Sequence, residues 1–361
     1  MSAGPARPGR GCGCLAGLGL LALAWLVTGG LAFLDLPRPG GAPETPPAPE
    51  ALPETFKRNP GALREHSREE AGPRWRLSFG FVDYHGRTHR IACHVDRAAH
   101  EAERAAFGYS PEELQAELNG ELARLLDAEI AARRVAPYFR IEFTGMGGYQ
   151  WSWKLPGGMD EAERVRARAA IEDLKVWIDE ELDRRDQAIR QAIYARHGLK
   201  LEDRKLKIDY EKLVTEGTQP LSDCFQALYE AGRGSSVRQY MGLLLAFLQE
   251  LEYEVPQDED DGRRRFGLRV PTDVLVSGKG DCDSKSVAFA SLWRRFPTSL
   301  IFILVPRHAL VGVEAQVYPD EEAVMVGNRR YVLCEVAGPA KIRPGGKSIA
   351  GSFEYILIEP M

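Results

Sequence analysis

The sequence is poor in cysteine and contains no Cys-x-x-Cys pair, which limits the kinds of site it can hold. Six cysteines in 361 residues are too few and too irregularly spaced for a disulfide scaffold. Without paired cysteines a structural zinc site has no support. We therefore expect neither a metal ion nor another cofactor.

The chain also lacks a dominant charge of either sign. Its 47 Lys and Arg residues and 52 Asp and Glu residues give a formal net charge of −5, and the basic residues form no single stripe. This balance argues against a nucleic acid as the main partner. With 44% apolar residues in 361 positions, the chain can bury a sizeable core, and its length favours two domains over one.

One long hydrophobic segment, residues 14–34, contains no charged residue. Roughly twenty apolar residues in a helix span a hydrocarbon core of about 30 Å. Arg7 and Arg10 precede the segment, so the positive-inside tendency keeps residues 1–13 in the cytosol and places the rest outside it. The alternative is a cleaved secretory signal with small residues around Ala32. We favour the uncleaved single-pass anchor, and both interpretations export the C-terminal part.

Residues 35–72 are predicted to be a disordered linker. Proline, alanine and glutamate dominate its first part, and proline at this density favours extended conformations over a packed core. Its last part, LREHSREEAG, is charged and lacks an apolar face, so we extend the linker to Gly72. Such a linker would hold the folded part of the chain away from the bilayer.

Residues 73–230 are predicted to form an α+β accessory domain with two β-hairpins. Residues 76–83 and 87–96 flank a short turn that contains glycine. Residues 138–144 and 149–155 form the second pair and are joined by a glycine-rich link. We can assign no chemistry to this region, which has the character of a positioning or recognition domain.

Two helices are predicted in the same domain. Ser110 with Glu113 makes a capping box and Pro111 occupies the first helical position. Apolar residues then recur at helical spacing: Leu114, Leu118, Leu122, Leu125 and Ile130. The second helix covers residues 160–197, ends at Gly198, and has one apolar stripe: Ile171, Leu174, Ile178, Leu182, Ile189 and Ile193. Its other faces are densely charged, so we expect this long helix to be a strut or to contact a protein partner.

Histidines and a cysteine near the first hairpin do not have the spacing of a metal site. His89 and Cys93 would share one face of a strand at a separation of about 13 Å, too far to bind one ion. His85 belongs to the turn and His94 points to the opposite face. Cys93 and Cys224 can form a disulfide in an oxidising compartment. Two buried free thiols are an equal alternative.

The sequence around Cys282 is typical of a nucleophile at the start of a helix. Gly278 and Gly280 precede it and permit unusual backbone angles. Apolar residues follow at helical spacing: Phe289, Leu292, Trp293 and Phe296. The N–H groups and the positive dipole at a helix start favour a thiolate and can hold an oxyanion. Asp281 and Asp283 can cap the helix but oppose thiolate formation, so a base is needed.

His308 is the candidate base and Glu335 the candidate third member. Residues 300–305 are a continuous apolar run of strand length, and His308 begins the next predicted strand, which continues through 309–315. A third strand, 330–336, carries Glu335 near its end. A cysteine at a helix start with a histidine and a carboxylate on adjacent strands is the arrangement of a thiol triad. The carboxylate would orient the imidazole that accepts the thiol proton.

The segments GKGDCDSKSVAFASLWRR, PRHALVGVE and RRYVLCEVAG together resemble the transglutaminase-like cysteine hydrolase and transferase core. The resemblance covers residues 235–340 and carries the roles of nucleophile, base and third member to Cys282, His308 and Glu335. It implies a papain-like α+β fold, with the cysteine-bearing helix packed on an antiparallel sheet, and thioester chemistry on amide bonds. The family most often has Asp in the third position, so Glu335 departs from the pattern.

Residues 231–361 are therefore predicted to be a catalytic domain outside the cytosol. The expected reaction is attack of Cys282 on a peptide, isopeptide or glutamine amide of a protein or peptide substrate, with hydrolysis favoured over cross-linking. The alternative is a binding or assembly module of the cell envelope that keeps the fold without turnover. In that case the helix at residues 160–197 would contact the partner.

Overall fold

The computed structural model describes residues 65–145, 148–202, 205–338, 340–347, 349 and 352–361. The predicted cytosolic N-terminus, the predicted membrane anchor at residues 14–34 and most of the predicted linker lie outside the described residues. Within the described ranges, no helix is both long enough and apolar enough to cross a membrane.

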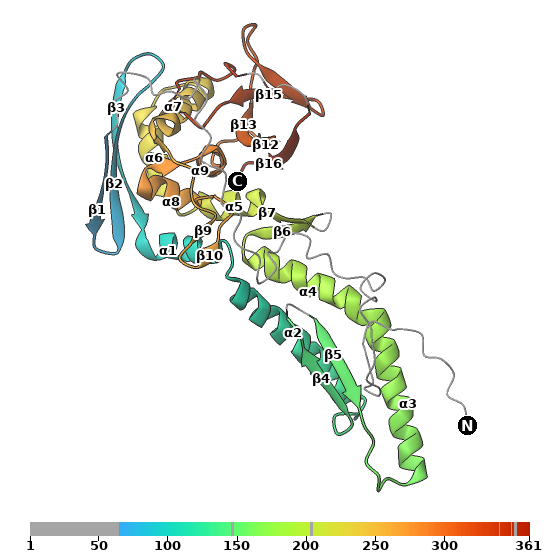
Figure 1. The fold of residues 1–361 in the computed structure, drawn as a ribbon. Helices are drawn as coiled ribbons and strands as arrows, with labels where there is room; N and C mark the ends of the chain where they lie inside the picture. Colours follow the sequence, from blue (N-terminus) through green and yellow to red (C-terminus); the bar gives the residue numbers. More distant parts are fainter. Residues whose placement is uncertain (1–64, 146–147, 203–204, 339, 348, 350–351) are drawn as a thin grey trace, which may run out of the picture. The chain divides into compact units, whose positions relative to one another are not determined.

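The protein is a mixed α+β structure with several antiparallel sheets, which confirms the coarse fold class (Figure 1). The described chain divides into two compact units. We call residues 109–196 and 200–207 the helical unit. We call residues 65–108, 197–199 and 208–361 the core unit. This division does not follow the predicted boundary at residue 230, because the first hairpin and three helices that begin before residue 230 belong to the core unit.

The helical unit begins with the predicted capped helix. Its elements are α2 (Pro111–Ala132), β4 (Phe139–Phe143), β5 (Tyr149–Trp153), α3 (Glu161–Trp177), η2 (Ile178–Leu182) and α4 (Asp183–Arg196). The Ser110 hydroxyl accepts a hydrogen bond from the Glu113 amide at 3.2 Å, and β4 pairs antiparallel with β5 as predicted. The buried face of α2 contains Leu126 in place of the predicted Leu125, because the apolar residues repeat every four positions.

The predicted long helix is interrupted by the π-helical segment η2 between α3 and α4. Its stripe is buried as predicted through Ile178 and Leu182. Beyond η2 the prediction is confirmed at Ile193, which is buried, but is wrong at Ile189, because the wider π-turn rotates the residues that follow it around the helix axis. The buried positions become Asp186 and Arg190, which form an ion pair at 2.8 Å, while Ile189 is only partly buried. The short strands β6 (Leu199–Glu202) and β7 (Lys205–Ile208) form a two-stranded sheet.

The core unit begins with a three-stranded antiparallel sheet in the order β1 (Glu65–Ala71), β2 (Arg74–Val82) and β3 (Thr88–Asp96). The predicted hairpin is confirmed, with Val82 paired to Thr88 beside the turn. The predicted extension of the linker to Gly72 is wrong, because residues 65–71 form β1. Every residue of β1 is exposed, so this edge strand is held by backbone pairing and shows no apolar alternation in the sequence.

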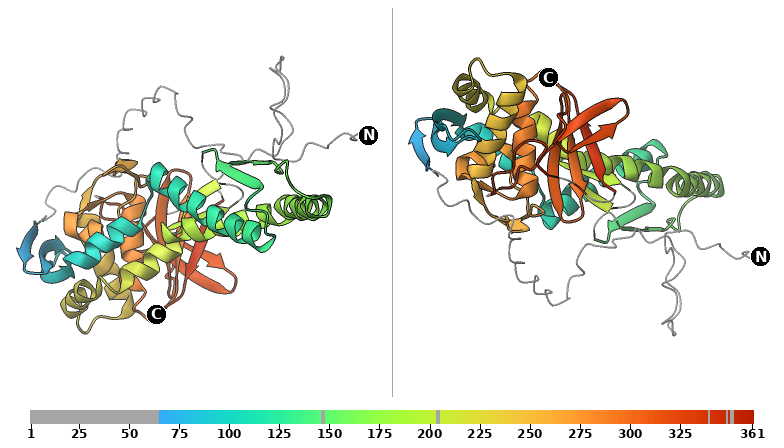
Figure 2. Two further views of the ribbon diagram at one scale, coloured as in Figure 1. Left: turned by 90° about the horizontal axis from the view of Figure 1, so that it is seen from below. Right: turned by 90° about the horizontal axis from the view of Figure 1, so that it is seen from above.

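A five-stranded antiparallel sheet forms the C-terminal part of the core unit and curls into a half-barrel (Figure 2). Its spatial order is β14 (Ala323–Val326), β15 (Arg329–Cys334), β13 (His308–Glu314), β12 (Leu300–Val305) and β16 (Glu354–Ile358). The sequence predicted β12, β13 and β15 but not the two outer strands. One face of the sheet encloses an apolar cluster: Ile301, Ile303, Leu310, Tyr331 and Leu333.

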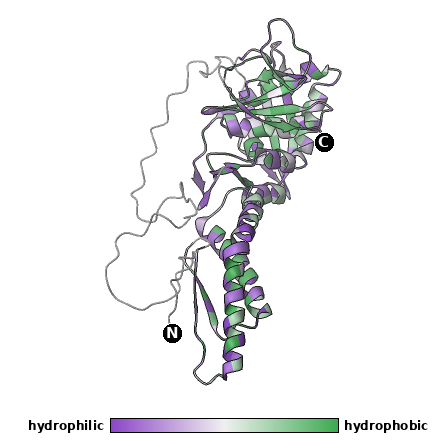
Figure 3. Cartoon of the chain, turned by 90° about the vertical axis from the view of Figure 1, so that its right-hand side faces the viewer, coloured by the Kyte–Doolittle hydropathy of each residue, from purple (hydrophilic) through white to green (hydrophobic). Residues whose placement is uncertain are grey.

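Helices pack around the remaining faces of the core unit. They are α1 (Arg97–Ala106), α5 (Tyr210–Thr218), α6 (Ser222–Ala231), α7 (Val237–Glu250), α8 (Pro271–Ser277) and α9 (Cys282–Trp293). Short strands complete it: β8 (Glu252–Tyr253), β9 (Glu259–Asp260), β10 (Arg263–Arg264) and β11 (Lys279–Gly280). Helix α9 is central, because it contacts α5, α7, α8, β12 and β13 and all its residues except Asp283 are buried. Figure 3, which colours each residue by hydropathy, shows hydrophobic segments along the strands and helices of the core unit.

Candidate active site

The polypeptide turns sharply just before Cys282. Gly278 ends α8 with a φ of +68°, and a Cβ atom there would lie 2.6 Å from the His66 ring. The next residues form β11, which pairs in parallel with β8. Asp281 then caps α9, since its carboxylate accepts a hydrogen bond from the Ser284 amide at 3.0 Å. Cys282 is consequently the first residue of α9, as the glycines and aspartates around it predicted.

The Cys282 thiol lies between the start of α9 and the start of β13. Cys282 is 7% exposed, and its sulfur accepts a hydrogen bond from the backbone N–H of Ala309, the residue after His308. The thiol also donates to the Asp283 carboxylate, with Sγ and Oδ1 3.2 Å apart. These contacts place the nucleophile beside the strand that carries the predicted base.

Burial raises the pKa of the Cys282 thiol, and the negative charges of Asp283 and Asp281 raise it further. The Ala309 N–H acts in the opposite direction because it stabilises the thiolate. The start of α9 was expected to stabilise the Cys282 thiolate. Burial and the two carboxylates have the larger effect, so the resting protein favours the thiol. Burial, with a further contribution from the negative charge of Asp283, raises the pKa of Asp281 to about 6.

His308 and Glu335 are in direct contact. The imidazole Nε2 and the Glu335 carboxylate oxygen Oε2 are 2.7 Å apart, and Glu335 is completely buried. The other carboxylate oxygen accepts the Ala337 N–H at 3.2 Å. Because Nε2 faces Glu335, a proton transferred from the thiol would go to the other ring nitrogen, Nδ1. Glu335 directly follows β15.

A buried glutamine fixes the backbone at Glu335. The Gln249 amide group donates to the Glu335 carbonyl at 2.6 Å and to the Ile342 carbonyl at 2.9 Å. Its oxygen accepts hydrogen bonds from the Tyr84 hydroxyl at 2.8 Å and from the Ile342 amide at 3.2 Å. Gln249 therefore positions the Glu335 segment and is not directed toward a substrate oxyanion.

A buried lysine one turn after the nucleophile holds the same segment. Lys285 is 0% exposed, and its ammonium group donates to the Leu251 carbonyl at 2.8 Å and to the Ala337 carbonyl at 2.7 Å. Helix α9 is thereby joined to the loop that follows Glu335. Neither this role nor that of Gln249 was predicted from the sequence. The one available signal was a lysine inside an otherwise apolar helix.

Aromatic residues surround the carboxylate next to the thiol. The Tyr210 hydroxyl donates to Asp283 Oδ2 at 2.7 Å, and the Tyr210 ring stacks on Phe302 with centroids 4.4 Å apart. Tyr253 lies on the short strand β8, and burial raises the pKa of its hydroxyl. The negative charges of Asp281 and Asp283 act in the same direction, and the ammonium group of Lys285 lies 5.8 Å from the centroid of the Tyr253 ring.

Metal binding has one candidate cluster among the described residues. One ligand atom each of Asp281, Cys282 and Asp283 lie within 4.8 Å of one another, but the Asp281 carboxylate is engaged by Ser284. In the first hairpin, two potential metal ligands already have protein partners. His89 contacts Asp83 at 3.0 Å, and Cys93 forms a disulfide with Cys224. Of the two alternatives for these cysteines, the structure has the disulfide.

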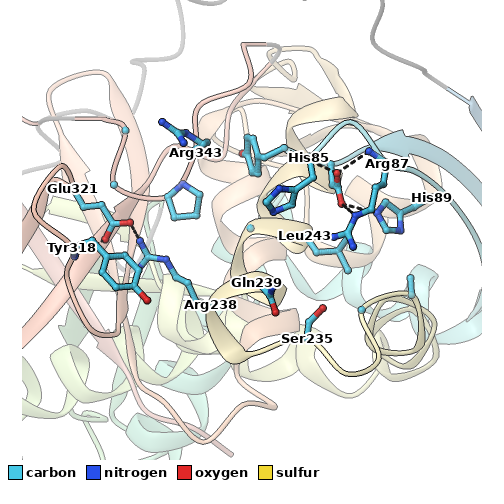
Figure 4. Close-up of a pocket in the computed structure, with 18 of the residues that line it drawn as sticks. His85, Arg87, His89, Ser235, Arg238, Gln239, Leu243, Tyr318, Glu321 and Arg343 are labelled. Atoms are coloured by element: carbon cyan, nitrogen blue, oxygen red, sulfur yellow. Dashed lines mark hydrogen bonds and ion pairs between the residues drawn. The ribbon is translucent and has the colours of Figure 1, made fainter.

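A cavity of about 470 Å³ in the core unit lies away from the candidate triad (Figure 4). The β2–β3 turn, the start of α7 and two loops of the half-barrel surround it, with Arg238 paired to Glu321 at one side and Arg87 paired to Asp83 at the other. Cys282, His308 and Glu335 do not line it. We place the candidate chemistry at the thiol, because the cavity wall consists largely of polar groups already paired with each other.

No protein-family model, curated protein or solved structure matches this chain. The evidence for the candidate site is therefore its geometry. His308 and Glu335 are in contact, and Cys282 is hydrogen-bonded to the residue after His308. The catalytic roles assigned to the three residues stay predictions.

Proposed function

We propose that this protein is a transglutaminase-like thiol enzyme that attacks amide bonds through a thioester intermediate. The observation that carries the proposal is the His308–Glu335 contact at 2.7 Å at the start of the strand whose Ala309 N–H donates to Cys282. A helix bearing the cysteine packs on an antiparallel sheet that presents the histidine and the carboxylate. This arrangement supports the papain-like and transglutaminase-like fold suggested by the sequence.

The reaction would begin with transfer of the Cys282 proton to Nδ1 of His308. The thiolate attacks the amide carbonyl carbon, and the resulting oxyanion is stabilised by N–H groups at the start of α9. His308 returns the proton to the leaving amine or ammonia as the carbon–nitrogen bond breaks. Water then attacks the thioester, passes a proton to His308 and releases a carboxylic acid, while the thiol regains its proton. Glu335 stabilises the imidazolium formed in both halves.

We favour hydrolysis over cross-linking, because no motif in the sequence marks a site for a second amine substrate. The substrate would be a peptide, isopeptide or glutamine amide of a protein outside the cytosol. The predicted anchor at residues 14–34 supports this location. The Cys93–Cys224 disulfide supports it independently, because such bonds persist in oxidising compartments. Mass spectrometry of the native N-terminus distinguishes an uncleaved anchor from a cleaved signal.

A second candidate function is a binding or assembly module that does not turn over substrate. The raised pKa of the Cys282 thiol favours it, since burial and two adjacent carboxylates keep the resting sulfur protonated. In that case His308 and Glu335 would form a structural ion pair without affecting the thiol.

The test is the rate at which iodoacetamide alkylates Cys282 at pH 7, followed by mass spectrometry of the peptide that contains it. If His308 is the base, His308→Ala should slow alkylation by about 100-fold, the lower end of the effect of a general base. His94→Ala is the matched control, because His94 pairs with Asp223 at the surface and should leave the rate unchanged. Equal rates in the wild type and His308→Ala would exclude the catalytic proposal and favour the binding module.

A further inference from the structure

The carboxylate of Asp283 lies next to the Cys282 sulfur. Its oxygen Oδ1 is 3.2 Å from Sγ, and Asp283 is the one residue of α9 that is not buried. A reacting atom must approach the sulfur to about 3–3.5 Å. Substrate atoms that approach the sulfur from the side of Oδ1 would therefore lie next to the Asp283 carboxylate.

No positive side chain within the described part of the chain forms an ion pair with Asp283. Its partners are neutral groups, the Tyr210 hydroxyl at 2.7 Å and the Cys282 thiol. Lys285, on the same helix, directs its ammonium group to the Leu251 and Ala337 carbonyls. A neutral hydroxyl orients a carboxylate but does not cancel its charge, so the negative potential extends to the sulfur.

Two tyrosines lie next to this charge. Tyr210 is fixed by its hydrogen bond to Asp283 and by stacking on Phe302, and Tyr253 lies close enough to feel the charge of Asp283. Tyr210 stacks on Phe302, and the Lys285 ammonium already lies 5.8 Å from the centroid of the Tyr253 ring, so the attraction for a further cation comes mainly from the Asp283 charge. The surroundings of the thiol therefore favour positive groups and repel negative ones.

We propose that Asp283 is a specificity-determining residue that selects a positively charged group, an alkylammonium or a guanidinium, next to the amide that Cys282 attacks. The link to catalysis rests on the proposed function. The preference for cations over anions can be measured at the Cys282 thiol whether or not the protein turns over a substrate. A cation bound at Asp283 would also neutralise one of the two charges that oppose thiolate formation. Substrate binding would thus promote the ionisation that the resting protein disfavours.

The test compares two thiol reagents of similar size and opposite charge on the full-length protein at low ionic strength, with a chelator present. These are 2-aminoethyl methanethiosulfonate and 2-sulfonatoethyl methanethiosulfonate. The Cys282 thiolate attacks the sulfenyl sulfur of either reagent, forms a mixed disulfide and releases methanesulfinate. The rate ratio of cation to anion is independent of the fraction of thiolate, because that fraction affects both reagents equally.

We expect the wild type to react at least about tenfold faster with the cationic reagent, given charges a few ångströms apart at a partly exposed site. Asp283→Asn should lower this ratio to about threefold or less, since only Asp281 remains. Asp283→Glu keeps the charge and should keep the preference. Asp320→Asn, which removes an exposed charge from the loop between β13 and β14, should leave the ratio as in the wild type.

A wild-type ratio near one, or the same ratio in Asp283→Asn and the wild type, would overturn the proposal. Failure of the proposed function has a different signature in this assay. His308→Ala should slow both reagents while leaving their ratio unchanged. If His308→Ala slows neither reagent, catalysis is excluded and the charge preference is judged separately by the Asp283 variants.

Discussion

The Cys282 thiol lies in surroundings that oppose its ionisation, although it is the residue on which the proposed chemistry depends. Burial and the charges of Asp283 and Asp281 raise its pKa, and one backbone N–H from Ala309 acts against them. A nucleophile in such a place needs proton transfer to a base at the moment of reaction. His308, oriented by a fully buried Glu335, is the group that the structure offers for this role.

The three candidate residues were predictable from the sequence, whereas their supporting residues were not. Cys282, His308 and Glu335 each follow a local signal, a helix start or a strand boundary. Gln249 acts on Glu335 across 86 positions, and Lys285 on Ala337 across 52, so their partners depend on tertiary packing that no local pattern contains.

Lys285 should contribute strongly to stability because it satisfies two buried carbonyls. Lys285→Met would leave the Leu251 and Ala337 carbonyls without that donor and should lower the free energy of unfolding by about 3 kcal/mol. Lys279→Met is the matched control, since Lys279 is partly exposed in its pair with Glu254 and should cost about 1 kcal/mol or less. Urea unfolding of both variants gives the comparison. Equal losses would show that the buried lysine has no special role.

Strands β12, β13 and β15 and helix α9 were predicted from the sequence, because each has a clear apolar pattern. Strand β1 was missed since both of its faces are exposed, and its stability comes from pairing with β2. The π-segment η2 was missed because a single extra residue in a turn leaves no trace in the apolar spacing before it. The edge strands β14 and β16 are short and only partly buried, which makes their patterns weak.

The contact between α1 and α8 predicts a pH-dependent stability. Glu103 of α1 accepts hydrogen bonds from the backbone amide and hydroxyl of Thr272 at the start of α8, and burial raises the pKa of its carboxyl to about 7. The folded protein therefore binds this proton more tightly than the unfolded chain does. The corresponding stability is fully present below about pH 4.5 and is lost as the pH rises through 7.

The expected result is a fall in the free energy of unfolding of about 2 kcal/mol between pH 5 and 8 that is absent in Glu103→Gln. Glutamine keeps the acceptor for Thr272 without a titrating proton. Glu101→Gln, an exposed position on the same helix, should retain the wild-type slope. Parallel profiles for the wild type and Glu103→Gln would contradict this account of the α1–α8 contact.

At the scale of the whole molecule, the boundaries of the two compact units cannot be predicted from the sequence, because each unit is built from several separate segments. The core unit contains residues 65–108 as well as the C-terminal part, so residues distant in sequence share one unit. The disulfide between Cys93 and Cys224 joins β3 to α6 across 131 positions. The sequence indicated that Cys93 and Cys224 could pair, but it gave no basis for choosing between a disulfide and two buried free thiols.

Loss of this disulfide should lower stability, because a long loop in the unfolded chain would no longer be closed. The double variant Cys93→Ala/Cys224→Ala should lose about 2–5 kcal/mol of unfolding free energy relative to the oxidised protein. Adding a reductant should destabilise the wild type by a similar amount and leave the double variant unaffected. A wild type that is insensitive to reductant would show that the bond does not stabilise the fold.

The central claim is that Cys282, His308 and Glu335 act as one unit. It is tested most directly by the alkylation rate of Cys282 at pH 7 in His308→Ala, Glu335→Gln and the combined variant. If Glu335 acts only through His308, the combined variant should react no more slowly than His308→Ala alone, while Glu335→Gln alone should be about 10- to 100-fold slower than the wild type. Rate losses that multiply in the combined variant, or a Glu335→Gln rate equal to that of the wild type, would contradict the triad.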